Sequence, residues 1–180
     1  MKIAVFCSAN SNIEPIYFEN TRELGEWIAK NGHSIVFGGC DMGLMECVAK
    51  AVADGRGMTI GVVPSKIEEN GHVSPHLSVE IPCNNLSDRK DLMLLKSDIV
   101  VALPGGLGTL DEIFTVAAAA TIGYHRKLVV LYNINGFWNS LIALLDDLQE
   151  RQMIRGDYHR HVLVANSLED LSKIIEEQTE

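Results

Sequence analysis

Short apolar runs rich in β-branched residues alternate with longer stretches of helical periodicity along the chain. Such alternation is typical of β-α units that feed a parallel sheet. Each run is almost continuously apolar, which predicts strands buried on both faces. The expected strands are residues 2–7, 34–37, 59–63, 98–103, 127–131 and 161–164.

The stretches between these runs carry apolar residues on one helical side and charged residues on the other, as in residues 14–31. In contrast, residues 64–85 mix proline, glycine and acidic residues without a sustained period, which predicts a long loop. Ser87 and Ser167 are expected helix N-caps. The predicted helices are residues 14–31, 44–53, 88–96, 107–122, 137–151 and 168–177.

A chain of 180 residues is the size of one domain. Right-handed crossovers between parallel strands place helices on both faces of the sheet. We therefore expect residues 1–180 to form a single α/β domain. Its architecture should be a Rossmann-like, doubly wound parallel sheet within a three-layer α/β/α sandwich.

Composition excludes several classes of function. The net charge of −9 argues against binding to a nucleic-acid backbone, which requires clustered lysine and arginine. No apolar run approaches the roughly 18–20 residues that span a bilayer, and the first run is too short for a signal peptide, so a cytoplasmic protein is expected. The four cysteines lack paired spacing and should remain free thiols. The histidines lack the spacing of a metal site, so no metal is expected.

In an open parallel sheet, ligands bind beyond the carboxyl ends of the strands. Three strand exits here are rich in small residues: residues 7–12, 37–44 and 103–112. The third is a glycine-rich turn that opens directly into a helix, where exposed amides and the helix dipole favour an anion. The predicted phosphate-binding residues from these exits are Ser8, Gly39, Gly105, Gly106, Gly108 and Thr109.

Glycines also form tight strand-to-helix turns without any ligand, but three such exits in one chain favour binding. No lysine follows the glycines, so the turn is not a Walker loop. A dinucleotide fingerprint would be expected after the first strand, where residues 7–12 contain no glycine. NAD is therefore disfavoured.

Two adjacent cations, Arg89 and Lys90, stand near the start of a predicted helix, where the dipole does not favour them. For Lys90, pairing with Asp88, Asp91 or solvent is an alternative to ligand binding. For Arg89 we favour the ligand. Glu112 lies one turn into the helix after the glycine turn and should point towards a ligand held there.

Residues 104–112 read Pro-Gly-Gly-Leu-Gly-Thr-Leu-Asp-Glu. This segment resembles the P-G-G-x-G-T-x-x-E signature of the LONELY GUY-type cytokinin riboside 5′-monophosphate phosphoribohydrolases. The likeness also covers residues 37–39, 43–45, 60–64, 89–90, 123–125, 131–133 and 136–137. It implies a Rossmann-like homodimer that releases a free base and ribose 5-phosphate from a nucleoside monophosphate such as AMP or N6-modified AMP, without an organic cofactor. Many members carry a lysine decarboxylase label, which we reject because that chemistry needs an electron sink such as pyridoxal phosphate.

The resemblance also implies roles for individual residues. Arg89 and Glu112 would be catalytic, and the glycine turn with Thr109 would take the phosphate. Cleavage of a glycosidic bond builds positive charge on the ribose and negative charge on the departing base. Glu112 can stabilise that cation, hold ribose hydroxyls or orient water. Arg89 can bind base or phosphate and offset leaving-group charge, although it is a poor proton donor.

The chain departs from the family pattern at several positions. Its first exit has Cys7-Ser8-Ala9 where C-G-S is usual, and Cys40 and Glu46 replace common glycines. Ala118 and Ala119 replace the Thr-Trp pair of plant-like members, which alters the base pocket or the dimer face. Two alternatives to the hydrolase follow: a non-catalytic nucleotide-binding or carrier protein, and a different glycosyl-bond reaction on a related nucleotide.

Overall fold

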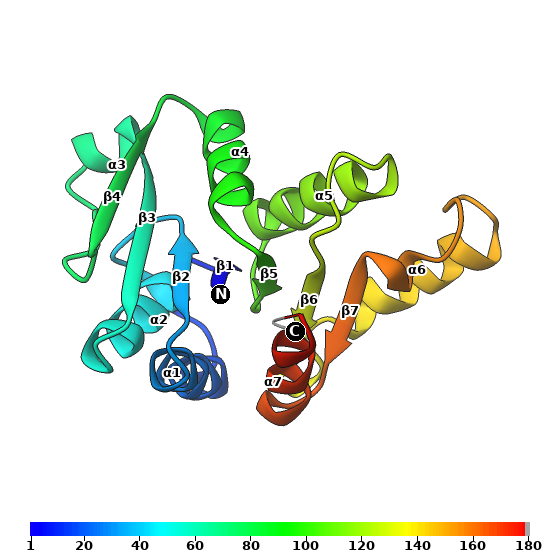
Figure 1. Cartoon of the computed structure of the whole chain (residues 1–180), viewed down its shortest axis with the longest axis horizontal. Coiled ribbons are helices and arrows are strands. Elements are labelled where there is room, and N and C mark those ends of the chain that lie inside the picture. The colour runs from blue at the N-terminus through cyan, green and yellow to red at the C-terminus, as the bar shows by residue number, and fades with distance from the viewer. Residues whose placement is uncertain (179–180) are drawn as a thin grey trace.

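The computed structural model describes residues 1–178, apart from the side chain of Ile67. Within these residues, seven strands form one sheet in the order β4-β3-β2-β1-β5-β6-β7, and every pairing is parallel (Figure 1). The predicted α/β class and parallel sheet are thus confirmed. The strands are β1 (Lys2–Phe6), β2 (Ser34–Phe37), β3 (Met58–Pro64), β4 (Val79–Cys83), β5 (Ile99–Ala102), β6 (Val129–Tyr132) and β7 (Val162–Ala165).

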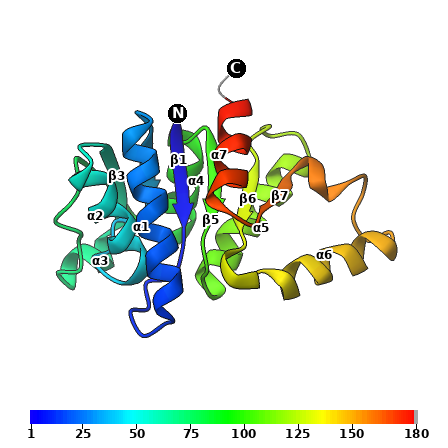
Figure 2. The same ribbon diagram turned by 90° about the horizontal axis from the view of Figure 1, so that it is seen from below.

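Helices cover both faces of the sheet, as Figure 2 shows. One buried cluster includes residues of α1, α2 and α7, and the other includes residues of α4, α5 and α6. The three-layer prediction is therefore confirmed. The helices are α1 (Pro15–Lys30), α2 (Gly43–Asp54), α3 (Ser65–Glu69), α4 (Leu86–Lys96), α5 (Leu107–Thr121), α6 (Asn139–Glu150) and α7 (Leu168–Glu177), with 3-10 turns η1 (Ile134–Gly136) and η2 (Tyr158–Arg160).

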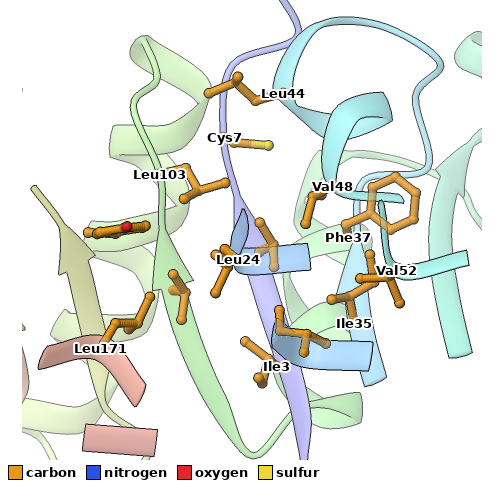
Figure 3. Packing of buried hydrophobic residues seen from close by; sticks show 14 of the residues in the cluster. Ile3, Cys7, Leu24, Ile35, Phe37, Leu44, Val48, Val52, Leu103 and Leu171 are labelled. Carbon is orange, nitrogen blue, oxygen red and sulfur yellow. The ribbon is translucent and has the colours of Figure 1, made fainter. Parts of the chain in front are cut away.

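Strand β1 explains why the apolar runs are continuous. Ile3 and Val5 belong to the cluster beneath α1, whereas Ala4 and Phe6 belong to the opposite cluster, because side chains alternate along a strand. Figure 3 shows Ile3 in the first cluster with side chains from α1, α2 and α7. Burying a large side chain such as Phe6 stabilises the fold by roughly 1.5–3 kcal/mol.

The predicted loop over residues 64–85 is wrong, because this segment contains α3 and the edge strand β4. Most of β4 is exposed or half-buried, and only Cys83 is buried. An edge strand with mixed burial has no continuous apolar run, and Pro82 is tolerated there because an edge strand has one unpaired side. The pattern that revealed the central strands is therefore missing from β4.

The two predicted N-caps have different outcomes. Ser167 caps α7, since its side chain accepts a hydrogen bond from the amide of Asp170. Ser87 is not a cap, because α4 begins at Leu86 and the side chain of Asn85 accepts from the amides of Ser87 and Asp88. Asn85 is among the strongest capping residues, so it starts the helix two residues earlier than predicted.

The free-thiol prediction is confirmed: Cys7, Cys40 and Cys83 are buried free thiols, and Cys47 is a half-buried one. Over residues 1–178, none of the helices is both long enough and apolar enough to cross a membrane. Within the same residues, no group of three or more His, Cys, Asp or Glu side chains is arranged to hold a metal ion.

Candidate active site

The sheet order places a crevice between the exits of β1 and β5. Strand β1 leads to α1 on one face, whereas β5 leads to α5 on the other. Chains that leave adjacent strands towards opposite faces open a crevice, which is where this class of fold binds ligands. A hydrogen bond from the amide of Ser8 to the carbonyl of Pro104 (3.0 Å) joins the two exits at this point.

The glycine turn after β5 forms one wall of this crevice. Gly106 is the N-cap of α5, and having no side chain it leaves the first amides of the helix open to an anion. Thr109 is buried behind the turn, and a Cβ on Gly105 would lie 2.1 Å from its hydroxyl oxygen. In contrast, a Cβ on Gly106 or Gly108 would meet no described atom within 4 Å. Packing therefore explains the glycine at 105 only, and the other two border open space.

The exit of β1 is tied to the start of α2. The carbonyl of Ser8 accepts a hydrogen bond from the amide of Leu44 (2.9 Å), and its hydroxyl accepts from the amide of Asn10 (3.0 Å). Gly43 lies here with a φ of +58°, and a Cβ at this position would lie 2.7 Å from the Ser8 carbonyl oxygen. Since a hydroxyl can donate as well as accept, the proton of Ser8 remains for another acceptor.

Arg89 extends from the first turn of α4 across the exits of β2 and β3. Its Nη2 donates to the carbonyl of Gly38 (2.9 Å), and its Nε donates to that of Val62 (3.3 Å). The side chain is only 12% exposed. A Cβ on Gly38 would lie 1.6 Å from Nη2, so this glycine makes room for the guanidinium.

Glu112 faces Arg89 from α5, with its Oε1 3.8 Å from the arginine Nη1 and its side chain 8% exposed. Burial raises the pKa of the Glu112 carboxyl to about 7, against the opposing effect of the positive charge of Arg89. Burial raises the pKa of the neighbouring Cys7 thiol as well, and the charge of Glu112 adds to that effect. A carboxyl group that titrates near neutral pH in a crevice is typical of functional sites.

Lys90 pairs with a different residue from the one that its neighbour Arg89 faces. Its Nζ lies 2.8 Å from both carboxylate oxygens of Asp111, and its side chain is 18% exposed. The alternative considered for Lys90 was pairing with Asp88, Asp91 or solvent. The pair with Asp111 ties α4 to α5 beside the Arg89–Glu112 pair, and phosphate binding by Lys90 stays a prediction.

Gly39 belongs to the turn after β2 and has a φ of +73°. A Cβ there would lie 2.5 Å from Cγ2 of Val63, so both backbone conformation and packing require glycine. The fold thus brings the predicted residues of three separate strand exits to one edge of the sheet. The acceptors of Arg89 were not predicted, because backbone carbonyls leave no mark in a side-chain pattern.

Sequence reasoning also missed an apolar wall beside the glycine turn. A cavity of about 200 Å³ opens there, and the rings of Tyr17 and Phe137 meet edge to face at its side, 5.6 Å apart. Phe137 was predicted only as the first residue of the helix over residues 137–151. Phe137 comes directly after β6 and η1, at the same sheet edge as the glycine turn. That position was the signal in the sequence that could have placed it at the site. The cavity is lined by Ser8, Ile13, Tyr17, Pro104, Gly105, Gly106 and Phe137.

Several known proteins are similar in sequence to this chain. The family model described as "Possible lysine decarboxylase" matches residues 45–175. A "probable cytokinin riboside 5′-monophosphate phosphoribohydrolase" of Oryza sativa subsp. japonica is 32% identical over 98% of this chain and 83% of its own length. A cytokinin riboside 5′-monophosphate phosphoribohydrolase of Arabidopsis thaliana is also 32% identical, over 98% of this chain and 81% of its own.

The chain belongs to the LONELY GUY family. Solved structures with the same fold as this LONELY GUY protein include proteins with a different described role. The molybdenum cofactor binding protein of Rippkaea orientalis is 26% identical, with a TM-score of 0.73 over 99% of this chain and 97% of that one. The molybdenum cofactor carrier protein of Chlamydomonas reinhardtii is 23% identical, with a TM-score of 0.77 over 99% and 97% of the two chains, and it shows the fold alone. The LONELY GUY fold is thus shared by proteins named as hydrolases and as cofactor binders.

Proposed function

We propose that this chain hydrolyses the N-glycosidic bond of a purine nucleoside 5′-monophosphate, releasing the free base and ribose 5-phosphate. The observation that carries the proposal is the buried pair of Arg89 and Glu112, 3.8 Å apart, beside a glycine turn at a helix N-terminus. The names of the rice and Arabidopsis relatives support the same reaction class. AMP and N6-modified AMP are the substrates to test.

The phosphate binds at the start of α5 in this proposal. Amides of the first turn and the dipole of the helix favour a dianion there, and the glycines allow close approach of the backbone. Thr109 and Ser8 add hydroxyl groups from the two strand exits. The residues assigned to the phosphate are Ser8, Gly39, Arg89, Lys90, Gly105, Gly106, Gly108 and Thr109.

Hydrolysis breaks the bond between C1′ and the base nitrogen, and both bonding electrons leave with the base. The ribose becomes cation-like in the transition state, and the ionised carboxylate of Glu112 stabilises it. Water adds its oxygen to C1′ and keeps one proton as the new hydroxyl group, while its other proton ends on the departing base. The positive charge of Arg89 offsets the negative charge on the leaving base without giving up a proton.

A non-catalytic carrier of a phosphate-bearing small molecule is the second candidate. It is favoured by the similarity to the Rippkaea orientalis protein, which is named for binding the molybdenum cofactor. In this alternative, the start of α5 still binds a phosphate group, but Glu112 and Arg89 only orient the ligand. Binding without turnover would identify it.

We also propose a homodimer formed through α5. Figure 1 shows α6 extending away from the sheet beside α5. Ala118 lines an apolar cavity of about 420 Å³, together with Phe114 of α5 and Leu148 of α6, and not the cavity at the glycine turn. Ala118, one of the two residues that replace the Thr-Trp pair of plant-like members, therefore lies on the apolar face formed by α5 and α6. Several large apolar side chains of α5 and its end are exposed: Leu107, Phe114 and Ile122.

The reaction is tested by measuring ribose 5-phosphate release from AMP and from N6-isopentenyl-AMP, with nucleotide binding measured in parallel. We expect release by the wild type, and loss of release with retained binding in Glu112→Ala. Glu112→Gln is the control for folding, because it keeps the size of the side chain but not the charge. Binding to the wild type without release from either nucleotide would favour the carrier instead.

A further inference from the structure

Residues 72–76, between α3 and β4, lie directly on the turn that follows β2. Most of the contact is made by the backbone, and Nδ1 of His72 also lies 3.2 Å from a carboxylate oxygen of Asp41. The turn that the segment covers is the one whose Gly38 carbonyl accepts a hydrogen bond from Arg89. The contacts join Val73 to Cys40 as an isolated antiparallel bridge, the amide of Ser74 to the carbonyl of Gly39 (2.8 Å), and the amide of Asp41 to the carbonyl of His72 (3.1 Å).

Glu46 holds this segment in place from the first turn of α2. One carboxylate oxygen accepts a hydrogen bond from the hydroxyl of Ser74 (2.6 Å), and the other accepts from Nδ1 of His76 (2.6 Å). The side chains of Glu46 and His76 are 23% and 28% exposed. Short hydrogen bonds to an ionised carboxylate are roughly twice as strong as neutral ones. Glu46 therefore binds the segment at two points.

The far end of the segment is fastened separately. The hydroxyl of Thr59, on β3, donates to the carbonyl of His76, and the amide of Ser78 donates to the same hydroxyl oxygen (2.9 Å). Loss of Glu46 would thus leave the segment attached to β3. The part that contacts the turn after β2 would then be held only by its backbone hydrogen bonds and the contact between His72 and Asp41.

The turn after β2 connects this segment with Arg89. Gly38 and Gly39 are consecutive, and their carbonyls have different partners: Gly38 accepts from Arg89 and Gly39 accepts from Ser74. Gly39 has a φ of +73°, and glycine is the residue with the greatest backbone freedom, so an unsupported turn here would move easily. The contact with Ser74 supplies that support.

We propose that Glu46 is a positioning residue, which through Ser74 and His76 fixes the glycine turn whose Gly38 carbonyl orients Arg89 towards Glu112. The proposal rests on the proposed roles of Arg89 and Glu112 in hydrolysis. A small misplacement of a catalytic group is enough to slow a reaction strongly.

The test compares Glu46→Ala with Glu46→Gln. Alanine removes both contacts, whereas the glutamine side chain still accepts from Ser74 and donates to Nδ1 of His76. Lys50→Ala is the matched control, one turn further along α2 in an exposed pair with Asp54. In Glu46→Ala we expect kcat to fall roughly ten- to a hundredfold with a smaller loss of affinity for AMP, because the amides at the start of α5 still bind the phosphate. Glu46→Gln and Lys50→Ala should retain wild-type kcat.

A second readout does not depend on activity. The Nε–H of Arg89 donates to the Val62 carbonyl and should give a distinct ¹⁵N NMR signal, assigned by its loss in Arg89→Lys. We expect this signal to shift or broaden in Glu46→Ala and to return in Glu46→Gln. An unchanged signal and an unchanged kcat in Glu46→Ala would overturn the positioning role. If the wild type releases no ribose 5-phosphate, the proposed hydrolysis fails, and the Arg89 signal alone decides whether Glu46 positions this side chain.

Discussion

At the scale of single residues, the site depends on a balance of opposing effects on Glu112. Burial favours the neutral carboxyl group, and the guanidinium 3.8 Å away favours the carboxylate. Burial is the larger effect, so the pKa rises to about 7. The negative charge of Asp111 adds to the effect of burial, and the positive charge of Lys90 opposes it. The result is a carboxyl group that changes its charge near neutral pH.

This pKa predicts the pH dependence of hydrolysis. Below pH 7 most Glu112 side chains are protonated and cannot stabilise a cationic ribose, so kcat/KM should rise with pH around a midpoint near 7. The measurement is kcat/KM for AMP across that pH range. The rise should vanish in Glu112→Gln, whose residual activity is insensitive to this group. A profile that falls through pH 7 would show that the protonated form is the active one.

At the scale of elements, the strand β5, the glycine turn and α5 act as one unit. Gly105 accommodates Thr109, whereas Gly108 borders open space at the point where α5 begins. Within one sequence signature, packing therefore requires glycine at position 105 but not at position 108. Replacing each of these glycines with alanine tests this difference.

Gly105→Ala should lower the free energy of unfolding by roughly 1–3 kcal/mol, because the added Cβ overlaps Thr109. Gly108→Ala should raise it by roughly 0.5–1 kcal/mol, because alanine is the better helix former. We expect both to weaken AMP binding, Gly108→Ala by placing a methyl group in the space assigned to the phosphate. Urea unfolding and AMP titration measure these effects. Undiminished affinity in Gly108→Ala would contradict the placement of the phosphate.

Elements also show where sequence patterns fail. Central strands such as β2 (Ser34–Phe37) match their predicted bounds because burial on both faces leaves a continuous apolar run. The edge strand β4 has no such run, and its pairing with β3 decides its conformation. The start of α4 was misplaced by two residues because Asn85 and Ser87 are both good caps in sequence, and only the observed hydrogen bonds distinguish them.

At the scale of the whole molecule, the apolar face of α5 and α6 lies away from the glycine turn. Ile122 is 71% exposed at the end of α5, which is costly for a large apolar side chain unless a partner covers it. A second copy of the chain would bury this face without obstructing the crevice between β1 and β5. The proposed dimer thus leaves nucleotide access open.

Ile122→Glu should therefore convert a dimer into a monomer, because a buried carboxylate without a partner strongly opposes association. Sedimentation velocity measures the mass of the wild type and of the variant. Met58→Glu is the matched control, since Met58 is an exposed apolar residue at the start of β3. Equal masses for the wild type and Ile122→Glu would exclude this face as the interface.

The α/β class, the central strands, the main helices and the glycine turn of the candidate site could all be predicted from the amino-acid sequence. These features are local, because burial and helical period leave a repeating pattern in consecutive residues. The tertiary structure decided the rest. The sheet order places β2, β1 and β5 side by side, which brings Arg89 against the Gly38 carbonyl and within 3.8 Å of Glu112. The raised pKa of Glu112 and the hydrogen bonds of Glu46 with Ser74 and His76 arise from contacts between elements distant in sequence. Both features therefore depend on how those elements pack.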